Sequence, residues 1–99
     1  MIVDYFREKI LNGFYRFSDH AVKRMIKREI SRHEVEFIIH SGEIIEEYRD
    51  DKYSPSCLIY GITKSGRIIH VLLSETPVVI IITVYEPDPA EWIDGKIRG

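Results

Sequence analysis

The chain has 99 residues, which fits a single domain, residues 1–99, with one small hydrophobic core. Its formal net charge of −2 at pH 7 argues against the uniformly basic proteins that coat nucleic acids. A single cysteine excludes an intrachain disulfide, and no apolar run is long enough to span a bilayer. We therefore expect a cytoplasmic protein that makes no use of a membrane.

The first and third predicted helices are marked by their ends. Residues 2–11 carry apolar residues at helical spacing, and Gly13 follows as a C-terminal stop. The aromatic stretch 14–17 is either a connector or a brief strand. A capping box, a serine followed three residues later by a glutamate, opens a helix over residues 31–41.

A basic helix is predicted over residues 18–28, with Ser18 as its N-cap. One apolar stripe comprises Ala21, Val22, Met25 and Ile26. The opposite face carries His20, Lys23, Arg24, Lys27 and Arg28. Like charges at this spacing repel one another, so we expect an anionic partner or neighbouring carboxylates.

After residue 42 the pattern of apolar residues changes to the alternation that is typical of strands. Short connections join four predicted antiparallel strands: 43–49, 56–63, 67–74 and 78–85. The last strand is apolar on both faces for most of its length, so it should be central in the sheet or covered on both sides. Trp92 should fold back as an anchor onto the sheet or the first helix, and residues 94–99 should fray. The predicted fold is α+β, with helices packed on one face of a four-stranded antiparallel sheet.

Polar residues interrupt the last two predicted strands. His70 is surrounded by apolar residues, which is typical of either a hydrogen-bonded core histidine or a proton-transfer group. If His70 lies opposite Thr83, then Tyr85 lies opposite Ile68 and three polar groups share one face. A slip of one residue would turn Thr83 and Tyr85 to the other face, and the pattern leaves this register open.

An ordered set of short motifs resembles a bacterial and archaeal domain family of unknown function. The motifs are His20-Ala21-x-x-Arg24-Met25-x-x-Arg28, Ile30-Ser31, Gly42-Glu43, Cys57-Leu58, His70-Val71 and Thr83-Val84-Tyr85-x-Pro87-Asp88. That family is usually placed near the RelE/BrnT-type toxins of toxin–antitoxin systems, and the resemblance covers residues 17–92. It implies a RelE-like build, RNA as a ligand, an antitoxin-like protein as a partner, and RNA cleavage as the candidate activity.

Metal-independent RNA cleavage needs a general base, a general acid and cations beside the phosphorus. His20 or His70 can transfer protons, and Arg24 and Arg28 can bind a phosphate in bidentate fashion. Tyr85 can stack on a base or donate a hydrogen bond. Further nucleic-acid contacts are expected from Lys23, Lys27 and Arg32. No cofactor is expected, and His33 and His40 lack the neighbours of a recognisable metal site.

Two other interpretations compete with a ribonuclease. The protein can be a non-catalytic module whose basic helix docks an acidic partner segment, or the basic face can be solvated and paired with carboxylates at Glu46, Glu47 or Asp50. Only the ribonuclease requires catalytic groups to converge on one phosphate. It therefore predicts that one concave surface is bordered by His20, Arg24, Arg28 and His70, with Tyr85 nearby. The oligomeric state is left open.

Overall fold

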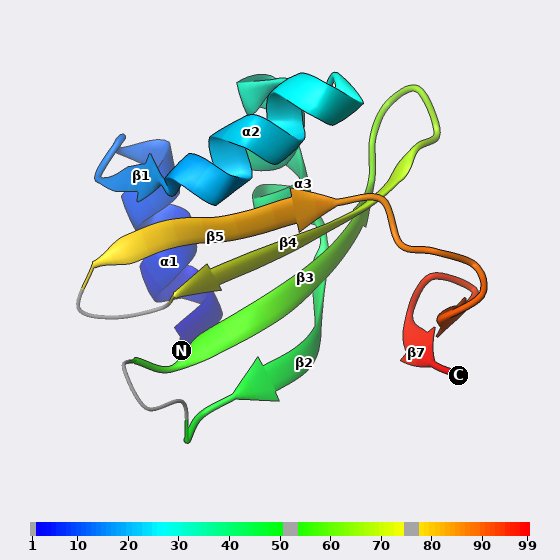
Figure 1. Ribbon diagram of the computed structural model, residues 1–99. Coiled ribbons are helices and arrows are strands. Elements are labelled where there is room, and N and C mark those ends of the chain that lie inside the picture. Colours follow the sequence, from blue (N-terminus) through cyan, green and yellow to red (C-terminus); the bar gives the residue numbers. More distant parts are fainter. Residues whose placement is uncertain (1, 51–53, 75–77) are drawn as a thin grey trace.

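Three helices lie against a mixed sheet of five strands in the computed structural model, which describes residues 2–50, 54–74 and 78–99 (Figure 1). The helices are α1 (Ile2–Leu11), α2 (Asp19–Arg28) and α3 (Arg32–Ser41). The strands of the sheet are β1 (Tyr15–Phe17), β2 (Glu43–Tyr48), β3 (Ser56–Ile62), β4 (Ile68–Ser74) and β5 (Val79–Tyr85). The predicted α+β class and the predicted helices are confirmed, with element ends shifted by one residue at most. None of the helices among these residues is long and apolar enough to cross a membrane.

The four predicted strands pair antiparallel as expected, but the prediction of a four-stranded sheet is wrong, because a fifth strand joins it in parallel. The strand order is β1-β5-β4-β3-β2, and β1 pairs in parallel with β5, from Tyr15 opposite Val79 to Phe17 opposite Ile81. The stretch 14–17, for which a connector was the alternative, thus contains a strand. Since β5 is apolar on both faces, the added edge strand gives it the interior position that its composition favours.

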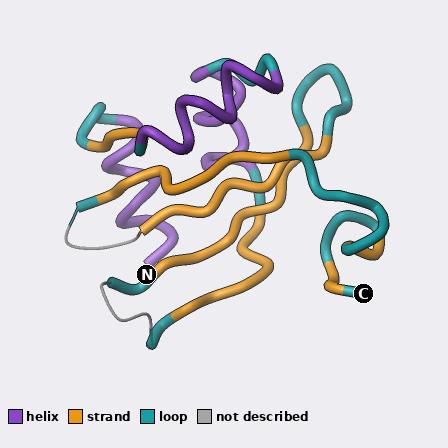
Figure 2. Tube along the Cα trace, in the orientation of Figure 1, coloured by secondary structure: helices purple, strands orange, loops and turns teal. Residues whose placement is uncertain are grey.

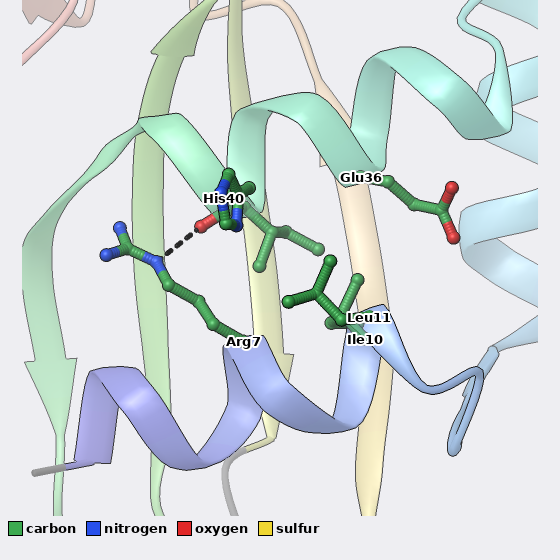
Figure 3. Close-up of a pocket in the computed structure, with 6 residues that line it drawn as sticks. Arg7, Ile10, Leu11, Glu36 and His40 are labelled. Carbon is green, nitrogen blue, oxygen red and sulfur yellow. Dashed lines mark hydrogen bonds between the residues drawn. The ribbon is translucent and has the colours of Figure 1, made fainter.

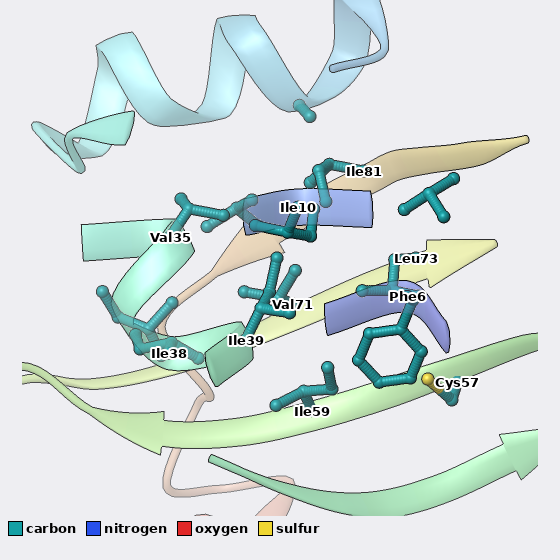
Figure 4. Packing of buried hydrophobic residues seen from close by; sticks show 14 of the residues in the cluster. Phe6, Ile10, Val35, Ile38, Ile39, Cys57, Ile59, Val71, Leu73 and Ile81 are labelled. Carbon is teal, nitrogen blue, oxygen red and sulfur yellow. The ribbon is translucent and has the colours of Figure 1, made fainter. Parts of the chain in front are cut away.

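The main core lies between the sheet and the helices, where α1 and α3 cover one face (Figure 4). Alternate residues of each strand face this core, among them Ile59, Val71, Leu73 and Ile81. Phe6 and Ile10 come from α1, and Val35, Ile38 and Ile39 come from α3. The layers approach closely at Gly61, where an added Cβ would lie 2.7 Å from Ile38 Cγ2. The glycine is therefore needed for α3 to pack directly on β3.

The opposite face of the sheet is covered in part by the C-terminal segment, which contains a hairpin of β6 (Trp92–Ile93) and β7 (Ile97–Arg98) (Figures 1 and 2). The Trp92 side chain is only 4% exposed, and its ring lies edge-on to His70 with centroids 4.5 Å apart. Lys96 and Arg98 form ion pairs with Glu43 and Glu46 of β2 at 2.7 and 2.8 Å. Residues 94–99, which we expected to fray, are therefore attached to the sheet.

The hairpin of β4 and β5 has a register two residues away from the one considered above. His70 pairs with Tyr85 and Leu72 with Thr83, and a β-bulge follows at Leu72/Leu73. Paired residues of neighbouring strands project to the same face. The three polar groups therefore do share one face of the sheet, which is the face away from α1 and α3.

We expect Trp92→Ala to lower the free energy of unfolding by about 3 kcal/mol or more, because the substitution removes the main buried contact of the C-terminal hairpin. Urea unfolding followed by circular dichroism measures the effect. Ile97→Ala on the same hairpin is the control, since that side chain is exposed and its loss should cost no more than about 0.5 kcal/mol. Equal stability of wild type and Trp92→Ala would contradict this account.

Candidate functional site

The N-terminus of α2 is attached to the sheet through one serine. Ser18 Oγ accepts a hydrogen bond from the Ala21 amide at 3.0 Å, as an N-cap does, and donates one to Ile82 O of β5 at 2.7 Å. The Ser18 amide also donates to Ile81 O, at 2.9 Å. The helix therefore starts where the short strand β1 ends, and it continues along β5.

The C-terminus of α2 is fixed by Arg67 of the turn between β3 and β4. Its guanidinium donates to the carbonyl oxygens of Arg28 and Glu29 at 2.8 and 3.0 Å, where the helix leaves carbonyls without helical partners. The same cation pairs with Glu86 at 3.3 Å and Glu34 at 4.0 Å. A cation at this end of a helix is also favoured by the helix dipole. Both ends of α2 are thus held, and its outer surface has a defined position.

The buried side of α2 is narrower than its apolar stripe. Of the four apolar residues, Ala21 is fully buried and Met25 half-buried, whereas Val22 is 42% and Ile26 74% exposed. The helix lies along β5 near the edge of the sheet, so a single line of side chains reaches the core. The apolar stripe of α2 is therefore only partly buried. Half of it faces solvent.

An apolar groove lies beside α2, formed by the exposed half of the stripe together with residues from the neighbouring elements. It has a volume of about 320 Å³ and is lined by Phe17, Val22, Met25, Ile26, Ile30 and Arg32. Exposed branched aliphatic side chains that adjoin a groove are typical of a surface that binds another molecule. We call this feature the α2 groove.

The basic ridge of α2 comprises His20, Lys23, Arg24, Lys27 and Arg28. Arg24 is half-buried and the other four residues are exposed, since Arg24 lies one turn from buried Ala21. Within the described part of the chain, none of the five side chains forms an ion pair.

Two of the three carboxylates proposed as partners of the ridge are engaged elsewhere: Glu46 pairs with Arg98 at 2.8 Å and Glu47 with Arg49 at 2.9 Å. The interpretation that Glu46 and Glu47 neutralise the basic face of α2 is therefore wrong. The positive charge of the ridge is left without a counter-charge from either of them.

His70 is fully buried on the opposite face of the sheet, with both ring nitrogens hydrogen-bonded. Its Nε2 lies 2.5 Å from Gly95 O, and because a carbonyl only accepts, Nε2 carries the proton. In the neutral ring Nδ1 is then an acceptor, and it receives the Tyr85 hydroxyl at 3.1 Å. Burial lowers the pKa of His70 below its usual value, and the bond to Gly95 opposes this shift. His70 therefore behaves as a neutral structural group that joins the C-terminal hairpin to the sheet.

A polar cluster beside His70 includes residues that the sequence analysis did not select. Arg98 forms two hydrogen bonds to Glu46, at 2.8 and 3.1 Å, and holds the pKa of this carboxyl below its usual value. Tyr48 also donates to Glu46. Burial raises the pKa of Tyr85. The signal that could have located Arg98 is Asp94-Gly95, a dipeptide that favours tight hairpin turns.

The predicted convergence of catalytic groups is wrong. His70 and Tyr85 lie together, but on the sheet face covered by the C-terminal hairpin. The other three proposed catalytic residues, His20, Arg24 and Arg28, belong to α2. This helix lies on the other face of the sheet, where its buried Ala21 is part of the core. Lys23 and Lys27 lie on the ridge, while Arg32 of α3 is hydrogen-bonded to the Tyr15 hydroxyl at 3.3 Å. The strand pairing sends the side chain of His70 away from α2.

A third location is a small pocket of about 130 Å³ between α1 and α3 (Figure 3). Arg7 reaches from α1 to the end of α3, where it donates to Ile39 O at 2.9 Å and Gly42 O at 2.7 Å. Glu36 accepts from the Tyr15 hydroxyl at 2.5 Å. The charged groups of this pocket are thus engaged in holding the helices. Among the described residues, no group of three or more His, Cys, Asp or Glu is placed to hold a metal ion.

A family model described as Domain of unknown function (DUF4258) matches residues 17–86. No curated protein and no solved structure matches the chain. The matched range contains α2, α3 and strands β2 to β5, and therefore includes the α2 groove and the basic ridge.

The lowered pKa of His70 makes stability depend on pH. The unfolded chain binds a proton near the ordinary pKa of about 6.5, whereas the folded chain resists protonation, so acid favours unfolding. We expect the advantage of wild type over His70→Gln in the free energy of unfolding to shrink between about pH 7.5 and about pH 5. The glutamine amide can still donate to Gly95 O. Urea unfolding of both proteins at several pH values measures the difference in their free energies of unfolding. If the advantage of wild type grew in acid, the pKa of His70 would not be lowered by folding.

Proposed function

The chain belongs to the family described as Domain of unknown function (DUF4258), and from this premise we propose that it is a binding module whose α2 docks an acidic, partly apolar segment of a partner protein. One observation carries the proposal: the apolar stripe of α2 continues onto solvent-exposed Val22 and Ile26, directly beside a basic ridge that forms no ion pair with any residue the structure describes. A binding site for such a segment needs an apolar contact that provides affinity and a charged rim that orients the partner.

The energetics favour a ligand that uses both parts of this surface. Apolar surface removed from water contributes about 25 cal/mol per Å², so covering the α2 groove stabilises a complex without any specific hydrogen bond. Arg24 and Arg28 are i, i+4 neighbours, and their mutual repulsion is relieved when carboxylates approach. Docking of an amphipathic segment into an apolar groove is a recurring mode of peptide recognition. An acidic amphipathic segment therefore fits better than a purely charged or a purely apolar one.

The likeness to RelE/BrnT-type toxins suggests which kind of protein supplies the segment. Within this proposal, the build is RelE-like and the partner is an antitoxin-like protein with an acidic region. The position of His70 counts against a ribonuclease that uses His20 and His70 together. The imidazole of His70 is buried, and both of its nitrogens are hydrogen-bonded. Any proton transfer beside a phosphate on the ridge would depend on His20.

RNA is the second candidate ligand, and the observation in its favour is the row of cationic side chains on α2. Lys and Arg side chains on one face are the usual contacts to phosphates. Binding of this type depends on charge and on salt, and it makes little use of an exposed isoleucine. The two candidates therefore differ in how they respond to a change at Ile26.

We expect a labelled helical peptide with leucines on one face and glutamates at its flanks to bind the protein, as followed by fluorescence anisotropy. Arg24→Ala/Arg28→Ala and Ile26→Ser should each weaken binding about tenfold or more, since they remove the charged rim and the apolar contact. Arg49→Ala and Ile62→Ser are matched controls, because they remove an exposed arginine and an exposed isoleucine elsewhere. Both should bind as wild type does.

A labelled single-stranded RNA is the comparison ligand in the same assay. If RNA binds more tightly than the peptide, with a steep salt dependence and no response to Ile26→Ser, the ridge is a nucleic-acid surface and the protein-docking proposal fails. If neither ligand responds to the α2 substitutions, then the surface is not the binding site.

Incubation with RNA, with and without EDTA, tests catalysis separately. We expect the RNA to remain intact in both cases, because His70 is buried under the C-terminal hairpin and cannot act together with His20 on one phosphate. Cleavage that persists in EDTA and disappears in His20→Ala would contradict this expectation. It would instead favour a metal-independent ribonuclease built on α2.

A further inference from the structure

The C-terminal hairpin has two faces of different character. Residues paired across an antiparallel hairpin project to one side, and their neighbours along each strand project to the other. Trp92, which pairs with Arg98, faces the sheet and is buried against His70. Ile93 and Ile97 pair with each other and are 55% and 63% exposed. The outer face of the hairpin thus presents two adjacent isoleucines to solvent.

Acidic residues flank Ile93, whereas Ile97 lies between Lys96 and Arg98, whose charges are paired with Glu43 and Glu46 of β2. Residues 86–94 contain four carboxylates and no lysine or arginine. Glu86 pairs with Arg67, whereas Asp88, Glu91 and Asp94 are exposed and form no ion pair with any residue that the structure describes. Asp94 lies in the turn between the strands, next to Ile93. This segment is therefore acidic and partly apolar, which is the chemistry that the α2 groove and the basic ridge require.

We propose that α2 of one copy of this chain binds the C-terminal hairpin of a second copy. Ile93 and Ile97 enter the α2 groove, and Glu91 and Asp94 lie along the basic ridge. The inference rests on the proposed function, because it names the chain itself as a source of the acidic segment. Charge complementarity between two surfaces of the same molecule carries it.

A single chain does not fill its own groove. The hairpin packs on the sheet face that contains His70, whereas α2 contributes Ala21 to the core on the other face, so the two surfaces lie apart (Figure 1). The contact is therefore head to tail, and each copy offers one groove and one hairpin. Such heterologous contacts extend into open chains unless they close into a ring. The small surfaces involved predict weak association at high protein concentration.

Two variants that each damage one of the two surfaces test the proposal. Ile26→Glu places a carboxylate in the α2 groove, and Ile97→Glu places one on the hairpin; both positions are exposed, so the fold should survive. Ile62→Glu is the matched control at an exposed isoleucine outside both surfaces. Circular dichroism checks the fold, and analytical ultracentrifugation measures mass between about 10 µM and about 1 mM, the range of weak association.

We expect wild type and Ile62→Glu to grow beyond dimers as concentration rises, while Ile26→Glu and Ile97→Glu each stay monomeric. An equimolar mixture of these two variants should form a dimer and stop there, because it contains one intact groove and one intact hairpin per pair. A monomeric wild type, or a mixture without dimers, overturns the proposal. If wild type is monomeric but still binds the acidic peptide, only self-association fails; if it binds no peptide, the proposed function fails as well.

Discussion

A sheet that carries buried residues on both of its faces must be covered from two sides, and the other elements of this protein are placed to meet that requirement. On one face, α1 and α3 cover Ile59, Val71 and Leu73. On the other, the C-terminal hairpin covers His70 with Trp92. His70 is fully buried under this hairpin, and a buried polar group needs hydrogen-bond partners within the protein. The bonds of His70 to Tyr85 and Gly95 satisfy this condition.

The position of α2 follows from the same arrangement. The central positions over the sheet are occupied by α1 and α3, so α2 lies along β5, attached by Ser18 at one end and Arg67 at the other. A helix at the edge of a layer buries less of its circumference than a central helix does. The uncovered part of α2 is apolar on one flank and basic on the other. This combination is the basis of our proposal that α2 docks an acidic segment.

The catalytic hypothesis required His70 and the arginines of α2 to lie on the same face of the sheet. Strand register and the placement of the helices decide whether they do. Motifs from α2 and β4 suggested one site, yet His70 projects from the sheet face opposite the helices. The position of a residue along a strand decides its face only once the pairing partner is known. The expected fraying of residues 94–99 failed for a related reason, since Lys96 and Arg98 are held by Glu43 and Glu46, about fifty residues earlier in the chain.

Local sequence determined the three helices, the N-caps of α2 and α3, and strands β2 to β5 to within a residue, because capping and apolar periodicity act over a few neighbouring residues. It left β1 open as a connector or a strand and did not indicate β6 and β7. It also determined that β5 is an interior strand and that Trp92 is buried. Tertiary structure alone decided that β1 joins the sheet in parallel, that His70 lies apart from the arginines, and that Val22 and Ile26 stay exposed. These outcomes depend on which distant surfaces meet, and the free energy of such contacts is set by packing between layers rather than by the residues of any one element.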